Sequence, residues 1–212
     1  MRALILAMAC VAVAVAAGEA RASVTVTFEE LSGAITRVPD GYSGFSSNNL
    51  WFTDASLGQY ASSGFVNGAV SGTRVAYNGS GRPASLSGSP FAFNSAYFTS
   101  AWNDDLTIKV DAFRGGSLLH SDSFMVDTKA PTFRVFNWAE IDELRFSASG
   151  GSPAGGLAGR GTHFTIDDLV VNDAGAIANP EPLSLAIWSG LITAAVAVAA
   201  ARRRLRAQPV AL

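Results

Sequence analysis

Apolar and polar side chains alternate along much of residues 23–172, and this two-residue period limits the fold more than any other feature. Leu106, Ile108 and Val110 alternate with polar residues, glycines follow, and residues 118–126 alternate again. This pattern is typical of a β-hairpin with one buried face. No stretch of this region shows a sustained helical period with capping residues, so we expect strands rather than helices.

Further strand candidates are separated by clusters of Gly, Ser and Asn. The period recurs in residues 24–28, 132–138, 141–148 and 164–171. Short strands with punctuating turns predict an all-β fold, an antiparallel β-sandwich whose strand number suits a jelly roll. A closed barrel is the alternative, because the sequence does not determine whether the sheet closes. We place the domain at residues 23–172.

The first 22 residues have the features of a secretory signal peptide. Arg2 supplies a positive start, residues 3–17 are almost entirely apolar, and Ala20 and Ala22 are small residues at the positions that signal peptidase recognises. A lipoprotein start at Cys10 is the alternative, but this cysteine lies inside the apolar segment and close to the N-terminus. We therefore predict an N-terminal signal helix that is removed on export.

A second apolar segment, residues 183–201, carries no charge and is followed by Arg202, Arg203 and Arg204. About 20 apolar residues are needed to cross a bilayer as a helix, and a basic cluster marks the cytoplasmic end. The alternative is a buried helix of a globular domain, which would be expected to have one polar face. We predict a transmembrane helix, joined to the domain by a linker at residues 173–179.

Residues 23–179 hold nine of the 15 basic and 15 of the 17 acidic residues, so their formal charge is near −6. This charge argues against nucleic acid or anionic lipid as a partner. The only cysteine of the chain is Cys10, so this region has neither disulfides nor thiol chemistry. Its stability must come from the core or from a bound metal.

Pro180, Glu181 and Pro182 stand directly before the apolar segment and its arginine cluster. Together with the signal peptide, residues 180–207 resemble the PEP-CTERM sorting signal of exopolysaccharide-producing Gram-negative bacteria. The resemblance implies transient insertion in the inner membrane, cleavage near the prolines by an exosortase, and a mature protein at the cell surface or outside the cell. The prolines suit this role because they hold an extended segment just outside the bilayer.

Residues 40–45 and 164–169 resemble carbohydrate-binding jelly rolls with a galactose-binding-like topology. This resemblance implies a structural calcium between the first and last strands, with Glu29, Asp167 and Asp168 in the corresponding places. Calcium prefers several oxygen ligands. Strand alternation sends Asp167 and Asp168 to opposite faces, so only one joins Glu29 unless the strand bends. Alternatively, all three carboxylates are solvated.

Three aromatic residues, Tyr42, Phe45 and Trp51, lie in or beside a stretch rich in Gly, Ser and Asn. Such rings could stack on sugars, which makes a carbohydrate-binding module the second functional hypothesis. The alternative is that they complete the core of the sandwich, which needs such residues.

Catalysis has little support in the sequence. His120 and His163 are far apart, and the carboxylates occur as sequence neighbours, which does not supply two acids across a cleft. The leading hypothesis is therefore a non-enzymatic exported surface or matrix protein associated with exopolysaccharide. A polysaccharide hydrolase is the least favoured hypothesis.

Overall fold

The computed structural model describes residues 23–171, and these residues lie within one compact unit, residues 21–175. The predicted signal peptide, the linker to the tail, and the sorting tail with Pro180 and Arg204 lie outside the described residues. Among residues 23–171, no helix has the length and apolar character needed to span a membrane.

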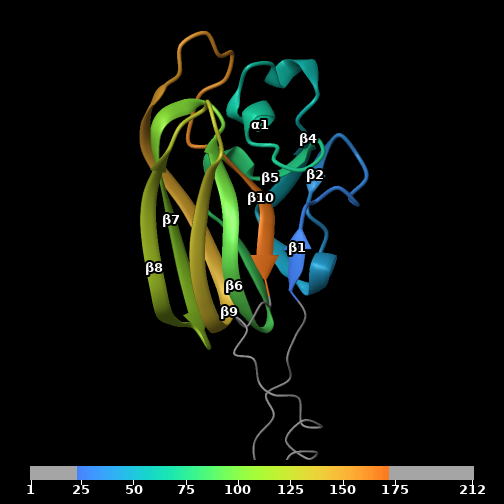
Figure 1. Ribbon diagram of the computed structural model, residues 1–212, viewed down its shortest axis with the longest axis vertical. Helices are drawn as coiled ribbons and strands as arrows, with labels where there is room; N and C mark the ends of the chain where they lie inside the picture. Colours follow the sequence, from blue (N-terminus) through green and yellow to red (C-terminus); the bar gives the residue numbers. More distant parts are fainter. Residues whose placement is uncertain (1–22, 172–212) are drawn as a thin grey trace, which may run out of the picture. The chain divides into compact units, whose positions relative to one another are not determined.

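The described chain is all-β, as predicted, and all its strand pairs are antiparallel. Only short helical turns interrupt the strands: η1 (Tyr42–Gly44), η2 (Gly58–Tyr60), α1 (Gly64–Asn67) and η3 (Gly79–Gly81). The strands are β1 (Val24–Val26), β2 (Ile35–Arg37), β3 (Ser46–Asn48), β4 (Leu50–Asp54), β5 (Arg74–Asn78), β6 (Ala84–Ser100), β7 (Asn103–Arg114), β8 (Ser117–Val126), β9 (Thr132–Pro153) and β10 (Phe164–Val171) (Figure 1).

One hydrogen-bonded path, β2-β4-β5-β10-β6-β9-β7-β8, connects most strands, while β1 pairs with β10 and β3 with β6. On this path β6 and β8 are three steps apart, which in a flat sheet would separate them by about 14 Å. The rings of Phe98 on β6 and Phe124 on β8 nevertheless have centroids 5.1 Å apart. The sheet therefore folds back on itself into a two-layer sandwich. In a closed barrel the first and last strands would pair with each other, whereas here the path ends at β2 and at β8. The barrel alternative is therefore wrong.

Two long strands pass from one layer to the other. In β6 the register with β9 shifts between Ser87 and Phe91 and twice more before Ser95. In β9, Asn137 and Glu140 have φ values of 52° and 56°, which bends the strand in its middle. Bulges and bends of this kind let a strand pass from one packed sheet to the other.

We call the two parts the first and second layers. The first contains β1, β2, β4, β5, β10, the end of β6 and the start of β9. The second contains β3, the start of β6, the end of β9, β7 and β8. Their facing sides form the main core, in which Phe93, Phe98, Leu144, Phe146 and Phe164 are fully buried.

The predicted hairpin at residues 106–126 is confirmed. β7 and β8 pair from Leu106↔Val126 to Arg114↔Ser117. The turn consists of Gly115 and Gly116, with φ values of 55° and 79°. Two positive φ values in a row are the condition for a two-residue turn of this kind, which explains the glycines.

An insertion at residues 55–73, not predicted as structured, lies on the outer face of the first layer. Its Tyr60 and Phe65 form a second apolar cluster with Val75 and Tyr77 of β5. The contact is close: a Cβ at Gly68 would stand 2.4 Å from the Thr165 Oγ1 atom. This face is therefore partly covered, whereas the outward side chains of the second layer are exposed or half-buried.

Candidate functional site

The outer face of the second layer carries one continuous line of polar side chains. Strand pairing places Asn48 opposite Ser85, Ser85 opposite Arg145, Arg145 opposite Asp111, and Asp111 opposite Ser121. These five residues come from β3, β6, β9, β7 and β8, and we call them the polar row. Their sequence neighbours point inward because side chains alternate along a strand.

The Arg145 side chain is held from two sides. Its Nε and Nη2 atoms donate hydrogen bonds to the two carboxylate oxygens of Glu143, at 2.7 and 2.9 Å. Its guanidinium carbon lies 4.2 Å from the centroid of the Phe113 ring. The hydrogen bond with Glu143 raises the pKa of Arg145 above its ordinary value. A planar group fixed in this way is ready to bind without losing much side-chain freedom.

The end of the polar row formed by Asp111 and Ser121 is also fixed by hydrogen bonds. Asp111 accepts a hydrogen bond from the Ser121 hydroxyl at 2.6 Å and one from the Lys109 ammonium at 2.8 Å. Partial burial opposes ionisation of Asp111, but these contacts prevail and place its pKa below the ordinary value. Asp111 is therefore a charged acceptor at neutral pH.

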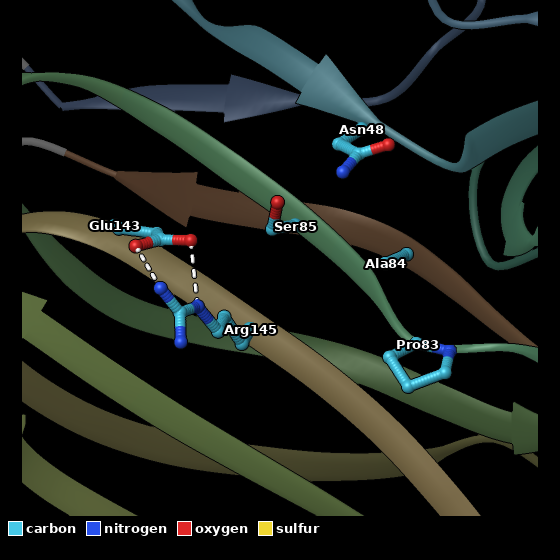
Figure 2. A pocket seen from close by; sticks show the side chains of 6 residues that line it. All are labelled: Asn48, Pro83, Ala84, Ser85, Glu143 and Arg145. Carbon is cyan, nitrogen blue, oxygen red and sulfur yellow. Dashed lines mark hydrogen bonds and ion pairs between the residues drawn. The ribbon is translucent and has the colours of Figure 1, made fainter.

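A hollow of about 280 Å³ opens over one end of the row (Figure 2). Its lining combines the Glu143–Arg145 ion pair with Asn48 and Ser85. Figure 2 shows the ion pair on β9 and the serine on the neighbouring β6. Three members of the polar row thus face the same space.

A second hollow, of about 560 Å³, lies at the loop end of the sandwich. Its polar side chains are those of Ser62, Asp104, Thr128 and Lys129, with residues 154–157 completing the wall. Asp104 accepts hydrogen bonds from the Thr128 backbone and hydroxyl, while the Lys129 ammonium lies 3.7 Å away and its side chain is 81 % exposed. Because this lysine is poorly fixed, the first hollow is the better candidate.

The aromatic residues predicted to bind sugars do not form one platform. Phe45 is buried and packs edge-on against Phe91 in the main core. Tyr42 packs against the same core and donates its hydroxyl to Glu30 at 2.7 Å. Trp51 packs against the second apolar cluster, on the outer face of the first layer. These placements agree with the alternative of core packing.

The residues predicted to bind calcium do come together, around residues 70–74. Asp167 accepts hydrogen bonds from the backbone N–H groups of Val70 and Ser71, at 2.7 and 3.0 Å. Asp168 accepts the Ser71 hydroxyl at 2.6 Å. Both acids reach one segment because Asp168 has a φ of 46° and the register with β6 shifts after Asp167. The bend that the sequence left open is therefore present.

Glu29 binds the same segment from the other side. Its Oε1 atom accepts hydrogen bonds from the backbone N–H groups of Thr73 and Arg74, at 3.0 and 2.6 Å. A Cβ at Gly72, where φ is 57°, would overlap the Glu29 carboxylate, so this close approach requires glycine. Glu29 and Asp167 thus fasten the end of the insertion to the sandwich.

These contacts bear on the calcium prediction. Asp167 already accepts three N–H groups, including that of Asp168, which leaves it little capacity for a cation. Within residues 23–171, no group of three or more His, Cys, Asp or Glu side chains is arranged to hold a metal. Calcium at Glu29, Asp167 and Asp168 stays a prediction, and its binding would require these carboxylates to turn toward the ion.

The two histidines lie in separate places. His120 stacks on Trp138, with ring centroids 5.3 Å apart and an interplanar angle of 12°. His163 is half-buried near Tyr77, and its burial lowers its pKa.

One pair of carboxylates that are neighbours in the sequence consists of Asp142 and Glu143. Asp142 accepts a hydrogen bond from the backbone N–H of Gly115, and Glu143 binds Arg145.

Comparison with protein-family models and with curated proteins gives no match. Among solved structures, a DUF4465 family protein from Bacteroides ovatus is 10 % identical, with coverage of 71 % of this chain and 88 % of that chain and a TM-score of 0.43. CBM51 from Clostridium perfringens GH95, solved with methyl-galactose, is 11 % identical over 70 % and 99 %, with a TM-score of 0.36.

A third structure, TmCBM61 in complex with beta-1,4-galactotriose, is 10 % identical, with coverage of 63 % of this chain and 93 % of that chain and a TM-score of 0.38. TM-scores this low carry no argument about function. The functional argument therefore depends on the residues of this chain.

Asp167 should give stability a distinctive pH dependence. Burial raises its pKa from 3.8 to about 6, although the N–H groups of Ser71, Val70 and Asp168 favour the ionised form. Between these values the folded protein holds a proton that the unfolded chain has released. The contribution of Asp167 to stability therefore falls as pH rises through this window, by up to about 1.4 kcal/mol for each unit of pH.

Asp167→Asn removes this titration, so the free energy of unfolding of the wild type minus that of the variant should decline from pH 4 to pH 6. Urea unfolding at several pH values, with a chelator present, measures this difference. Asp54→Asn is the control, because hydrogen bonds from Ser56 place the pKa of Asp54 below its ordinary value. A difference that stays flat for Asp167→Asn would contradict the assignment.

If calcium binds at Glu29, Asp167 and Asp168, it should stabilise the fold by mass action, by about 2.7 kcal/mol at one hundred times its dissociation constant. Thermal unfolding with millimolar calcium and with chelator tests this directly. Glu29→Gln should abolish any difference between the two curves. Coincident curves for the wild type would rule out the ion.

Proposed function

We propose that this chain is an exported, non-enzymatic protein that binds polysaccharide through the outer face of its second layer. Export rests on the signal peptide at residues 1–22 and the sorting tail at residues 180–207. Signal peptidase and an exosortase are its partners during export, and its stay in the inner membrane is transient. The mature protein works at the cell surface or in the extracellular polysaccharide.

The observation that carries the binding function is the Glu143–Arg145 pair in its open hollow. Sugar hydroxyls are bound by planar polar groups that donate and accept hydrogen bonds side by side. Arg145 engages Glu143 with two of its three nitrogens and keeps further N–H donors for a ligand. Asn48 and Ser85 add donors and acceptors in the same hollow.

The same geometry argues against hydrolysis. A glycosidase needs two carboxyl groups across the sugar, and its general acid needs a raised pKa. Glu143 is paired with Arg145, and Asp111 has a lowered pKa. Among the described acids, the raised carboxyl pKa belongs to Asp167, which is buried in the first layer beneath the insertion.

Arg145→Ala should weaken polysaccharide binding about ten- to a hundredfold, because hydrogen bonds to a charged group contribute about 1.5–3 kcal/mol. Affinity electrophoresis through gels that contain soluble polysaccharides measures the retardation. The Arg145 side chain is 53 % exposed, so the melting temperature should hardly change. Arg160→Ala, which removes the same charge from an exposed position on the loop before β10, should bind like the wild type.

If Arg145→Ala and Arg160→Ala were retarded equally, the assignment of the binding site to Arg145 would be wrong. Reducing-sugar release by the wild type, lost in Glu143→Gln, would overturn the non-enzymatic assignment.

Export predicts a defined mature protein. Intact-mass spectrometry of the protein from its native host should show a chain that begins near Ser23 and ends near Pro180. Replacing Pro180 and Pro182 by alanine should leave the apolar helix attached and the protein in the membrane fraction. A mature mass that still includes residues 183–212 would contradict processing by an exosortase.

A further inference from the structure

We infer that the ligand is a neutral polysaccharide chain that lies across the strands, with one sugar unit over each strand along the polar row. This inference rests on the proposed function and adds the direction, length and charge of the ligand. Its basis is the alignment of Asn48, Ser85, Arg145, Asp111 and Ser121 across five strands.

The spacing of the row suits a sugar chain. Neighbouring strands lie about 4.8 Å apart, so the row spans about 19 Å over its four intervals. One strand spacing is close to the length of one pyranose unit in a linear chain. Each unit can therefore meet one member of the row, which gives five subsites in register with five strands.

A chain that ran along the strands would meet a different surface. Outward side chains on one strand recur about every 6.7 Å, which matches a pyranose unit poorly. Along β7 the apolar ring of Phe113 follows Lys109 and Asp111, so the series of hydrogen-bonding side chains is interrupted in this direction. Across the strands, every member of the row is a hydrogen-bonding residue.

The row next to it supplies a border. Ser87 lies opposite Glu143, Glu143 opposite Phe113, and Phe113 opposite Leu118. Phe113 is half-buried under Arg145, and Leu118 is 53 % exposed. These two apolar side chains flank the row at its Asp111 end. They suit the C–H groups of a sugar ring and favour a chain that is confined to the polar row.

Charge selects a neutral chain. Both cations of this face, Arg145 and Lys109, are already paired, with Glu143 and Asp111 at 2.7 and 2.8 Å. A uronate would have to displace one of these carboxylates or lie beside it, which costs Coulomb energy. The formal charge near −6 of residues 23–179 repels it further. Hydroxyl groups can instead share the remaining N–H groups and lone pairs of both ion pairs.

The test is a length series. The full-length chain, in a detergent without sugar head groups, is titrated with neutral β-1,4-linked gluco-, galacto-, manno- and xylo-oligosaccharides of two to seven units. Oligomannuronates and oligogalacturonates of the same lengths are the charged counterparts. We expect binding of a neutral series to strengthen with each added unit up to about five and then level off. The uronates should bind at least tenfold more weakly.

Variants at the two ends of the row locate the chain. Asn48→Ala and Ser121→Ala should each weaken binding of the five-unit oligosaccharide several-fold. A two-unit oligosaccharide cannot reach both ends of the row, so at least one of the two variants should bind it almost as well as the wild type does. Ser147→Ala, on the same face but outside the row, is the control and should bind like the wild type. All three residues are on the surface or half-buried, so folding should be retained.

The outcomes separate the inference from the proposed function. Binding that levels off at two or three units, or is insensitive to Ser121→Ala, would place the ligand in the hollow alone and overturn the inference while leaving the function. Tighter binding of uronates would also overturn it. Failure of every oligosaccharide to bind, together with unretarded migration in polysaccharide gels, would overturn both.

Discussion

A sheet with one apolar face is stable only when another layer covers that face, and in this protein the sheet covers itself. β6 and β9 bend in the middle, which brings Phe98 on β6 against Phe124 on β8 although the two strands are three steps apart in the sheet. The bends therefore create the main core. They also decide what happens to the two outer faces: the insertion at residues 55–73 packs on one, and the other carries the polar row.

The alternation of side chains was enough to predict the all-β fold and the β7–β8 hairpin, because both follow from a regular period. It failed where the period breaks. It does not reveal β6, because the inward residues of this strand run Phe91 and Phe93 and then Ala96 and Phe98, a change of phase caused by bulges. The two strand candidates at residues 132–138 and 141–148 are one bent strand for the same reason. Bulges depend on partner strands, which a local pattern does not reveal.

The candidate site shows a similar division. A resemblance groups Glu29, Asp167 and Asp168, and the three residues do contact one segment, but in the described structure Glu29 and Asp167 accept backbone N–H groups and Asp168 accepts the Ser71 hydroxyl. The polar row could not be found in this way. Its members are ordinary serines, an asparagine and charged residues of five strands, and each resembles any other solvated position on its own strand. Only the register makes Asn48 and Ser121 parts of one line.

The location of the row on strands rather than loops has a consequence for binding. In the middle of the row, β6, β9 and β7 are each paired with a strand on both sides, so the spacing between Ser85, Arg145 and Asp111 is set by the hydrogen bonds of the sheet. Little conformational entropy remains to be lost when a ligand binds, even though each contact with a hydroxyl is weak. A shallow, regular surface of this kind gains affinity by repetition along a polymer. The aromatic residues that a single-sugar pocket would need can then remain in the core, where Phe45 is found.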